Sequence, residues 1–446
     1  MSLENSRHVE ALRRDLSREE TGRRLMAWIE KLYPIPRSIT GPGLRRTLEW
    51  IQERLPDLER REAPTGTKVL DWEVPREWRV REAWIRDPSG RKLADFDEHN
   101  LHLVGYSVPV DREVERAELE EHLHSLPEHP DWIPYRTSYY SETWGFCLTH
   151  RQREALPEGI YRVRIDSELV SGALSWGELV LPGREEGEIL LSCHVCHPSL
   201  ANDNLSSLAV AVALAGQLGE LQDRRWTYRF LFVPGTIGAI TWLASNRETV
   251  ARIRAGLVLA NLGDCGGFTY KRTHSGTAWI DRVMERLSAE TGTSFEHRPF
   301  SPFGYDERQY NSPGFRLPVG RLTRTPHGEY PEYHTSADDL SLVEPEALAG
   351  SLDLLLAAAE ILEGDDVYRN LAPYGEPQLG RRGLYRSLGG GTEGRERELA
   401  LLWVLNQSDG GPGLLEIAAR AGLPFRRIRE AAAALVDAEL LVPGAP

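Results

Sequence analysis

Three short apolar runs separated by two helical segments constrain the fold of this chain more than any other feature. The runs at 188–192, 228–233 and 255–260 have the length and composition of buried strands. The segments at 205–218 and 237–246 have helical patterns. Because strands alternate with helices, the sequence predicts an α/β fold with a doubly wound, mostly parallel sheet. Ligands bind beyond the carboxyl ends of such strands, so polar residues that directly follow the runs are the first candidates for a site.

The rest of the 446-residue chain divides into segments of different composition, and its length exceeds what one hydrophobic core usually supports. Helical patterns at 20–62 predict the start of the α/β domain, and short alternating runs at 63–148 predict an inserted β-rich domain. The α/β pattern then occupies 149–366. A stretch at 367–391, rich in Gly, Pro and Arg, indicates a linker, and the helix–turn–helix pattern at 392–446 resembles a winged-helix module.

Composition and charge exclude several classes of protein. With 41% hydrophobic and 27% charged residues, the chain has the balance of a folded globular protein. Its formal net charge of -14 disfavours nucleic acid and anionic membranes, so we expect a small molecule or peptide as ligand. The amino terminus lacks the apolar core of a signal peptide, and no stretch offers the ~18 apolar residues of a membrane span. Four cysteines are too few for a disulfide framework, and we therefore expect a cytoplasmic protein.

A His-rich segment directly follows the first apolar run and supplies residues that bind metals. Zinc used for hydrolysis takes imidazole nitrogens and carboxylate oxygens and keeps a position open for water. The residues that offer such ligands near predicted strand ends or in the His-Thr motif are His194, His197, Asp203, Asp264 and His334.

The spacing of Cys193, Cys196 and His197 is also that of c-type haem attachment. The lack of an export signal and the position at the end of a buried strand argue against haem. A structural zinc site on both cysteines would want two more soft ligands nearby in sequence, and none follows.

The order of these residues resembles that of the co-catalytic zinc aminopeptidases, a family that also includes glutamate carboxypeptidases and glutaminyl cyclases. That family has a strand ending in a His ligand, an Asp-Asn segment opening a helix, a strand with Glu, a strand with Asp, and a His-Thr motif. The matching positions here are His194, Asp203, Asp264 and His334. The resemblance implies one or two zinc ions and a small peptide or aminoacyl amide as substrate.

Four phrases resemble, more closely, a little-characterised bacterial branch of aminopeptidase-like proteins. Those proteins carry an inserted β domain and a terminal winged helix, and they are often associated with polysaccharide or natural-product biosynthesis. The phrases lie at 37–41, 196–199, 306–310 and 329–336.

One position departs from the family pattern. Where the aminopeptidases carry a Glu pair, as base and ligand, the turn at 233–238 has Gly235 and no carboxylate. A hydrolytic site needs a base for the attacking water, and Glu307 is the nearest replacement, with Glu332 in reserve. The short spacing to Asp203 leaves open whether His194 or His197 is the first ligand.

These observations predict a zinc-dependent hydrolase of the aminopeptidase type that cleaves an amide or peptide bond. The absence of a carboxylate at Gly235 keeps a second hypothesis open, a metal-binding but catalytically inert protein in a biosynthetic pathway. The winged helix suggests a third, a DNA-linked regulator, because 425–429 is basic. The acidic chain argues against DNA, and we expect the module to serve subunit contact in a homo-oligomer or to cover a cleft.

Overall fold

The apolar runs of the sequence form the centre of one large mixed sheet in the computed structural model, which describes residues 2–385 and 392–444. Over these residues the sheet has eight strands. Its central four are parallel, whereas β10 pairs antiparallel with β12 and β1, and β14 pairs antiparallel with β16. In spatial order the strands are β1 (Glu59–Pro64), β10 (Ala173–Leu181), β12 (Thr227–Val233), β11 (Glu188–His194), β13 (Ile253–Leu259), β16 (Val319–Thr323), β14 (Phe268–Lys271) and β15 (Phe295–Arg298). The expected α/β fold with a mostly parallel sheet is therefore confirmed.

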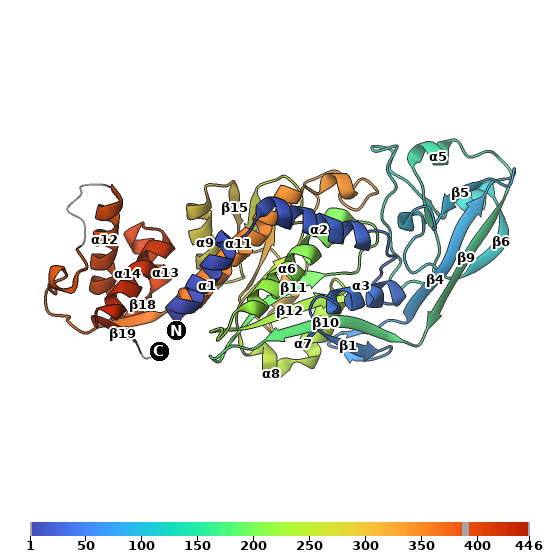
Figure 1. Cartoon of the computed structure of the whole chain (residues 1–446). Coiled ribbons are helices and arrows are strands. Elements are labelled where there is room, and N and C mark those ends of the chain that lie inside the picture. Colours follow the sequence, from blue (N-terminus) through green and yellow to red (C-terminus); the bar gives the residue numbers. More distant parts are fainter. Residues whose placement is uncertain (1, 386–391, 445–446) are drawn as a thin grey trace.

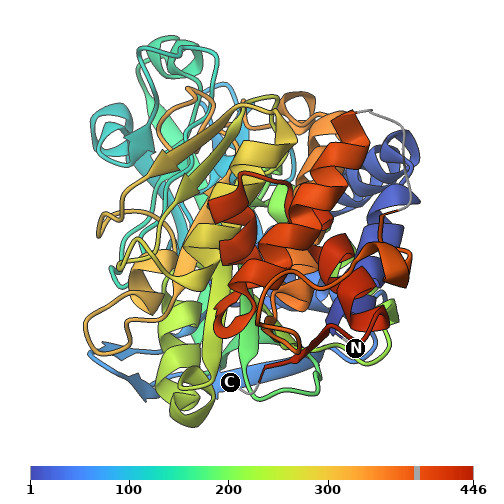
Figure 2. The same cartoon turned by 90° about the vertical axis from the view of Figure 1, so that its left-hand side faces the viewer.

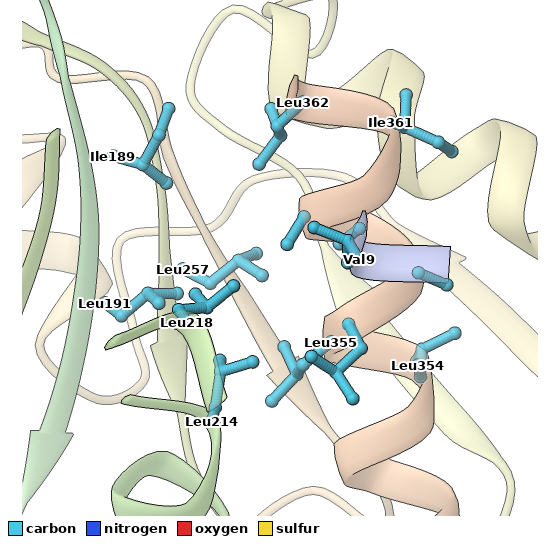
Figure 3. Close-up of a cluster of buried hydrophobic side chains, with 14 of the residues drawn as sticks. Val9, Ile189, Leu191, Leu214, Leu218, Leu257, Leu354, Leu355, Ile361 and Leu362 are labelled. Carbon is cyan, nitrogen blue, oxygen red and sulfur yellow. The ribbon is translucent and has the colours of Figure 1, made fainter. Parts of the chain in front are cut away.

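Helices cover both faces of this sheet, and strand β11 shows why. Its alternate side chains Ile189 and Leu191 pack on one face with Leu214 and Leu355, whereas Leu190 belongs to the core on the other face (Figure 3). The first face is covered by α2 (Arg18–Leu32), α6 (Ser207–Glu220), α9 (Trp279–Thr291) and α11 (Pro345–Gly364). The second is covered by α7 (Ile237–Ser245) and α8 (Arg247–Val250). Burial on both faces explains the uninterrupted apolar runs.

The β-rich insert is longer than the sequence predicts. Its antiparallel sheet has the order β5 (Lys92–Asp95), β4 (Glu77–Arg86), β9 (Ile160–Val170) and β6 (Val110–Glu115). Strand β9 lies beyond the expected boundary at 148, and it buries Tyr161, Val163 and Ile165 on one side only. That alternation belongs to a sheet with one covered face and sets β9 apart from the strands of the main sheet.

Short elements complete the insert and the connections. They are α3 (Pro42–Gln52), β2 (Lys68–Val69), β3 (Trp72–Glu73), η1 (Asn100–His102), α4 (Arg116–Glu120), β7 (Leu123–His124), β8 (Phe146–Cys147), α5 (His150–Glu154), η2 (Ala201–Ser206), α10 (Glu307–Tyr310), η3 (Leu340–Leu342) and η4 (Gly380–Arg382). No helix among the described residues is long and apolar enough to cross a lipid bilayer.

The carboxyl-terminal module begins earlier than the sequence predicts. Strand β17 (Val367–Asn370), which falls in the expected linker at 367–391, pairs with β18 (Asp409–Gly413) and β19 (Leu441–Pro443). The helices of the module are α12 (Thr392–Gln407), α13 (Leu414–Ala421) and α14 (Phe425–Asp437). The end of the expected linker, 386–391, lies outside the described residues.

The three parts lie in a row, with the insert and the carboxyl-terminal module at opposite ends of the α/β domain (Figure 1). Figure 2 views the row from the end of the module, which there lies in front of the α/β domain. Helix α1 (Ser2–Arg14) runs beside α11 and reaches the module, where Glu10 pairs with Arg426 and Arg429 of α14. The basic side chains of α14 are thus engaged by acids: Arg427 pairs with Glu430.

Candidate metal centre

The centre lies at the carboxyl end of β11, the strand at the middle of the parallel part of the sheet. His194 is the last residue of this strand, and its side chain is 3% exposed. The chain then runs through a loop into η2 and α6, which brings Asp203 back to the strand end. The site therefore forms where the sequence pattern predicts it, at the edge where parallel strands end.

The backbone around Asp203 is held in place by a second carboxylate, Asp338. Its two oxygens accept hydrogen bonds from the backbone N–H groups of Asn202 (2.6 Å) and Asp203 (3.0 Å), and its carbonyl accepts one from Ala201. Burial raises the pKa of Asp338 to about 8. The side chain of Asn204 donates to the carbonyls of His194 and Leu259, which ties this segment to two strands. Asp203 consequently sits on a fixed turn.

Three imidazoles surround the Asp203 carboxylate, which is fully buried. His194 Nε2 lies 2.8 Å from Oδ1, His334 Nε2 lies 3.0 Å from Oδ2, and His197 Nε2 lies 3.8 Å from Oδ2. The ligand atoms of His194, His197 and Asp203 all lie within 4.8 Å of one another, close enough to hold a metal ion. Exposure of the side chains rises from 3% for His194 through 15% for His197 to 33% for His334, so the group opens to solvent on the side of His334.

The protonation states of this group suit a cation. Burial lowers the pKa of His197 to about 3, which leaves a neutral imidazole with a lone pair to donate. Burial alone would raise the pKa of Asp203, but His197 and His194 outweigh it and hold that pKa well below its usual range. Imidazole nitrogens and carboxylate oxygens are the ligands that zinc takes in hydrolytic sites, so the residues present fit zinc.

Aromatic rings, one of them from the insert, line the group. Tyr305 stacks on His194 with 5.2 Å between ring centroids, and Tyr333 stacks on His334 at 4.0 Å. Tyr135 of the insert contacts both His197 and His334, and its backbone N–H donates to the His334 carbonyl (2.8 Å). A bridge between Pro134 and Thr335 continues this contact. The insert thus builds one wall of the site.

Two residues predicted for the site lie outside this group. Both carboxylate oxygens of Asp264 accept hydrogen bonds, from Asn202, Gly266 and Thr325. Among the described residues the three whose ligand atoms could share an ion include neither Asp264 nor His334, but His334 contacts Asp203 directly. Glu307 is fully buried, and its Oε1 lies 2.8 Å from Lys271 Nζ. Both carboxylates have local partners, and Glu307 Oε2 alone among their oxygens has no hydrogen-bond partner within the described part of the chain. The reserve candidate Glu332 is half-buried, two residues before His334.

Two further residues at the site were not singled out from the sequence. Asn261 is fully buried, and its amide nitrogen donates to Tyr305 Oη (3.0 Å), while its Oδ1 has no hydrogen-bond partner among the described residues. Asp306 receives a hydrogen bond from the backbone N–H of Thr236 (2.7 Å). Asn261 comes two residues after the end of β13, and this position near a strand end could have identified it as a site residue from the sequence.

Comparison with known proteins gives the chain a family. A family model described as a domain of unknown function, DUF4910, matches residues 26–365, and a winged helix-turn-helix model matches 366–443. The second match confirms the predicted winged helix. A protein of Clostridium acetobutylicum is 46% identical over 422 residues, which are 95% of this chain and 96% of the relative. Its name gives it an aminopeptidase-like domain and a provisional role in polysaccharide biosynthesis.

Solved structures agree with this family. A crystal structure from Clostridium acetobutylicum, provisionally described as a peptidase, has a TM-score of 0.93 at 43% identity and covers 98% of this chain and 100% of its own. A zinc aminopeptidase of Bacillus subtilis has a TM-score of 0.58 at 12% identity over 76% of this chain and 94% of its own. That distant likeness shows the aminopeptidase fold. The chain belongs to the DUF4910 family, whose domain here has the fold of the zinc aminopeptidases and is followed by a winged helix.

Proposed function

We propose that this protein is a zinc-dependent hydrolase that cleaves the amide bond of a small peptide or aminoacyl amide. The observation that carries the proposal is the group of three imidazoles around the buried Asp203, at the strand-end edge of an aminopeptidase fold. The aminopeptidase-like relative supports a peptidase-like reaction. Because that relative's name mentions polysaccharide biosynthesis, we place the reaction in a biosynthetic pathway.

Each residue of the group would have a distinct role in the reaction. His194, His197, His334 and Asp203 would hold the ion, which would polarise the substrate carbonyl and make water a better nucleophile. The lowered pKa of Asp203 favours its ionised form, which is the form that binds a cation. The rings of Tyr135, Tyr305 and Tyr333 pack on the imidazoles and would shield part of the centre from bulk water.

The test uses the full-length protein purified without chelator. We expect zinc bound to the protein by mass spectrometry and turnover in a panel of aminoacyl amides, both lost on chelation and both restored by zinc. His194→Ala should lose zinc and activity together. His274→Ala, at an exposed imidazole outside the group, is the matched control and should retain both.

Two results would contradict the proposal in different ways. Hydrolysis that survives complete removal of the metal would reject the zinc mechanism. Bound zinc with no turnover of any amide would favour the alternative, a metal-binding but inert protein of the same pathway, for which the missing carboxylate at Gly235 is the specific observation.

A further inference from the structure

The turn after β12 leaves an open position beside the metal centre. Gly235 lies in this turn, and a Cβ atom added there would sit 3.7 Å from the Cβ of His194 and 3.5 Å from Cys196 Sγ. Both are ordinary van der Waals distances, and the backbone of Gly235 is outside the positive-φ region. Neither steric overlap nor backbone strain therefore requires glycine here. A side chain at position 235 would point its first atom toward His194.

A carboxylate from another part of the chain reaches the same turn. Asp306 follows β15 and precedes the short helix α10, yet its Oδ1 accepts a hydrogen bond from the N–H of Thr236 (2.7 Å). Thr236 is the amino-terminal cap of the nine-residue helix α7, and a helix amino terminus stabilises an anion. Asp306 is only 3% exposed, and its second oxygen accepts no hydrogen bond from the described residues. One oxygen of Asp306 is therefore held by the turn, and the other is free to accept a proton.

Electrostatics also link Asp306 to the metal centre. Burial raises the pKa of Asp306 to about 6, and of the groups that counter this rise His194 has the largest influence. The neighbouring acid, Glu307, is also buried and also has one oxygen without a partner among the described residues, but it pairs with cations and not with the turn of Gly235. Glu307 is committed to Lys271 at 2.8 Å, with Arg321 at 3.6 Å from the same oxygen. Of the two adjacent carboxylates, Asp306 adjoins the turn of Gly235 and Glu307 stabilises a buried ion pair.

We propose that Asp306 is the general base of the reaction, a role that rests on the proposed function. As the water oxygen bonds to the carbonyl carbon, its proton passes to the free oxygen of Asp306. When the C–N bond breaks, the same proton passes to the leaving nitrogen, so that acid and amine are released and Asp306 is again ionised. Asp306 would thus supply, from a distant loop, the carboxylate that position 235 lacks.

The experiment compares kinetics and zinc content of Asp306→Asn with those of the wild type. Loss of a general base should lower kcat by about 10²- to 10⁴-fold and leave KM and zinc content within about twofold. Adding Gly235→Glu to Asp306→Asn should raise kcat again by at least about tenfold, because a Cβ atom fits at position 235 beside His194 and the added carboxylate could act as base. The assignment would be overturned if Asp306→Asn had the kcat of the wild type or had lost its zinc. It would also be overturned if a folded Glu307→Gln lost as much kcat as Asp306→Asn.

A second readout does not depend on turnover. An aminoacyl hydroxamate binds a zinc site as an anion and gives up a proton, which a neighbouring base can retain. Calorimetry in two buffers of different ionisation enthalpy should therefore show about one more proton released by Asp306→Asn than by the wild type. If the wild type hydrolyses no amide, the proposed function fails, and equal proton release by the two proteins separately refutes Asp306 as the proton acceptor.

Discussion

Replacing Arg429 with methionine should loosen the winged helix from the α/β domain. The guanidinium of Arg429 is 1% exposed and donates to Ser6 Oγ (2.9 Å), to Glu360 Oε1 (2.8 Å) and to the carboxylate of Glu10. Methionine keeps most of the volume of the side chain but leaves two carboxylates without this partner. Breaking a buried pair from one side costs about 3–5 kcal/mol. Arg13 still pairs with Glu360 at 2.9 Å, so we expect a cost near the lower limit, about 3 kcal/mol.

Hydrogen exchange followed by mass spectrometry measures this loss locally. A cost of about 3 kcal/mol corresponds to roughly 150-fold faster exchange of the slowest amides of α14, while those of α6 in the main domain keep their rates. Arg420→Met is the control, because Arg420 pairs with Glu416 at an exposed position and should change exchange little. Unchanged exchange of α14 in Arg429→Met would refute the view that this buried network fixes the module.

Three further predictions concern the site, the cysteines and pH. Asp264→Asn should keep its bound zinc but lower the free energy of unfolding by about 1–3 kcal/mol, because one oxygen that accepts hydrogen bonds becomes an NH2 group that donates them. His334→Ala, by contrast, should lose zinc. Metal analysis and urea unfolding check both variants, and zinc loss in Asp264→Asn would contradict the structure. Iodoacetamide at pH 8 should alkylate the exposed Cys265 in the folded protein. Burial raises the pKa of Cys196 to about 12, so this cysteine should be alkylated only after unfolding. Equal labelling of the two cysteines in the folded protein, measured by mass spectrometry, would be inconsistent with this burial. Burial lowers the pKa of His99 to about 4 from an unfolded value of 6.5, so the unfolded chain binds the proton first, and His99 alone should lower the free energy of unfolding by about 2 kcal/mol from pH 7 to pH 5. The fall measured by urea unfolding should be smaller by this amount in His99→Asn than in the wild type, and an equal fall in the two proteins would reject the shift.

The parts of the fold that follow from local patterns were predictable from the sequence. Uninterrupted apolar runs such as 228–233 required a strand buried on both faces, and the structure has β12 there. Strand β9 was assigned to the wrong domain, because an alternating run does not reveal which sheet it joins. Strand β17 was hidden by its position next to a Gly- and Pro-rich stretch, since its pairing with β18 depends on residues about 40 positions away.

The candidate site was predictable where ligands lie at strand ends and harder to predict where loops from distant segments meet. His194 and Asp203 follow one apolar run closely, so their proximity depends on local chain geometry. Asn261 and Asp264 both follow β13 closely, and the resemblance to the aminopeptidase pattern selected Asp264, whose carboxylate the structure engages in hydrogen bonds. The sequence indicated Glu307 as a base, but which of the adjacent acids Asp306 and Glu307 meets the turn of Gly235 depends on the buried Lys271, which no local pattern indicates.

The central claim is that imidazoles and one carboxylate hold zinc here, while the adjacent cysteines do not. X-ray absorption at the zinc edge of the purified full-length protein tests it most directly, because nitrogen and sulfur neighbours differ in distance and scattering. The account predicts a first shell at about 2.0–2.1 Å with the outer-shell pattern of imidazole rings, and this signal should be absent in His194→Ala because that variant no longer holds zinc. A sulfur shell at about 2.3 Å, lost when Cys193 and Cys196 are replaced by alanine, would contradict it.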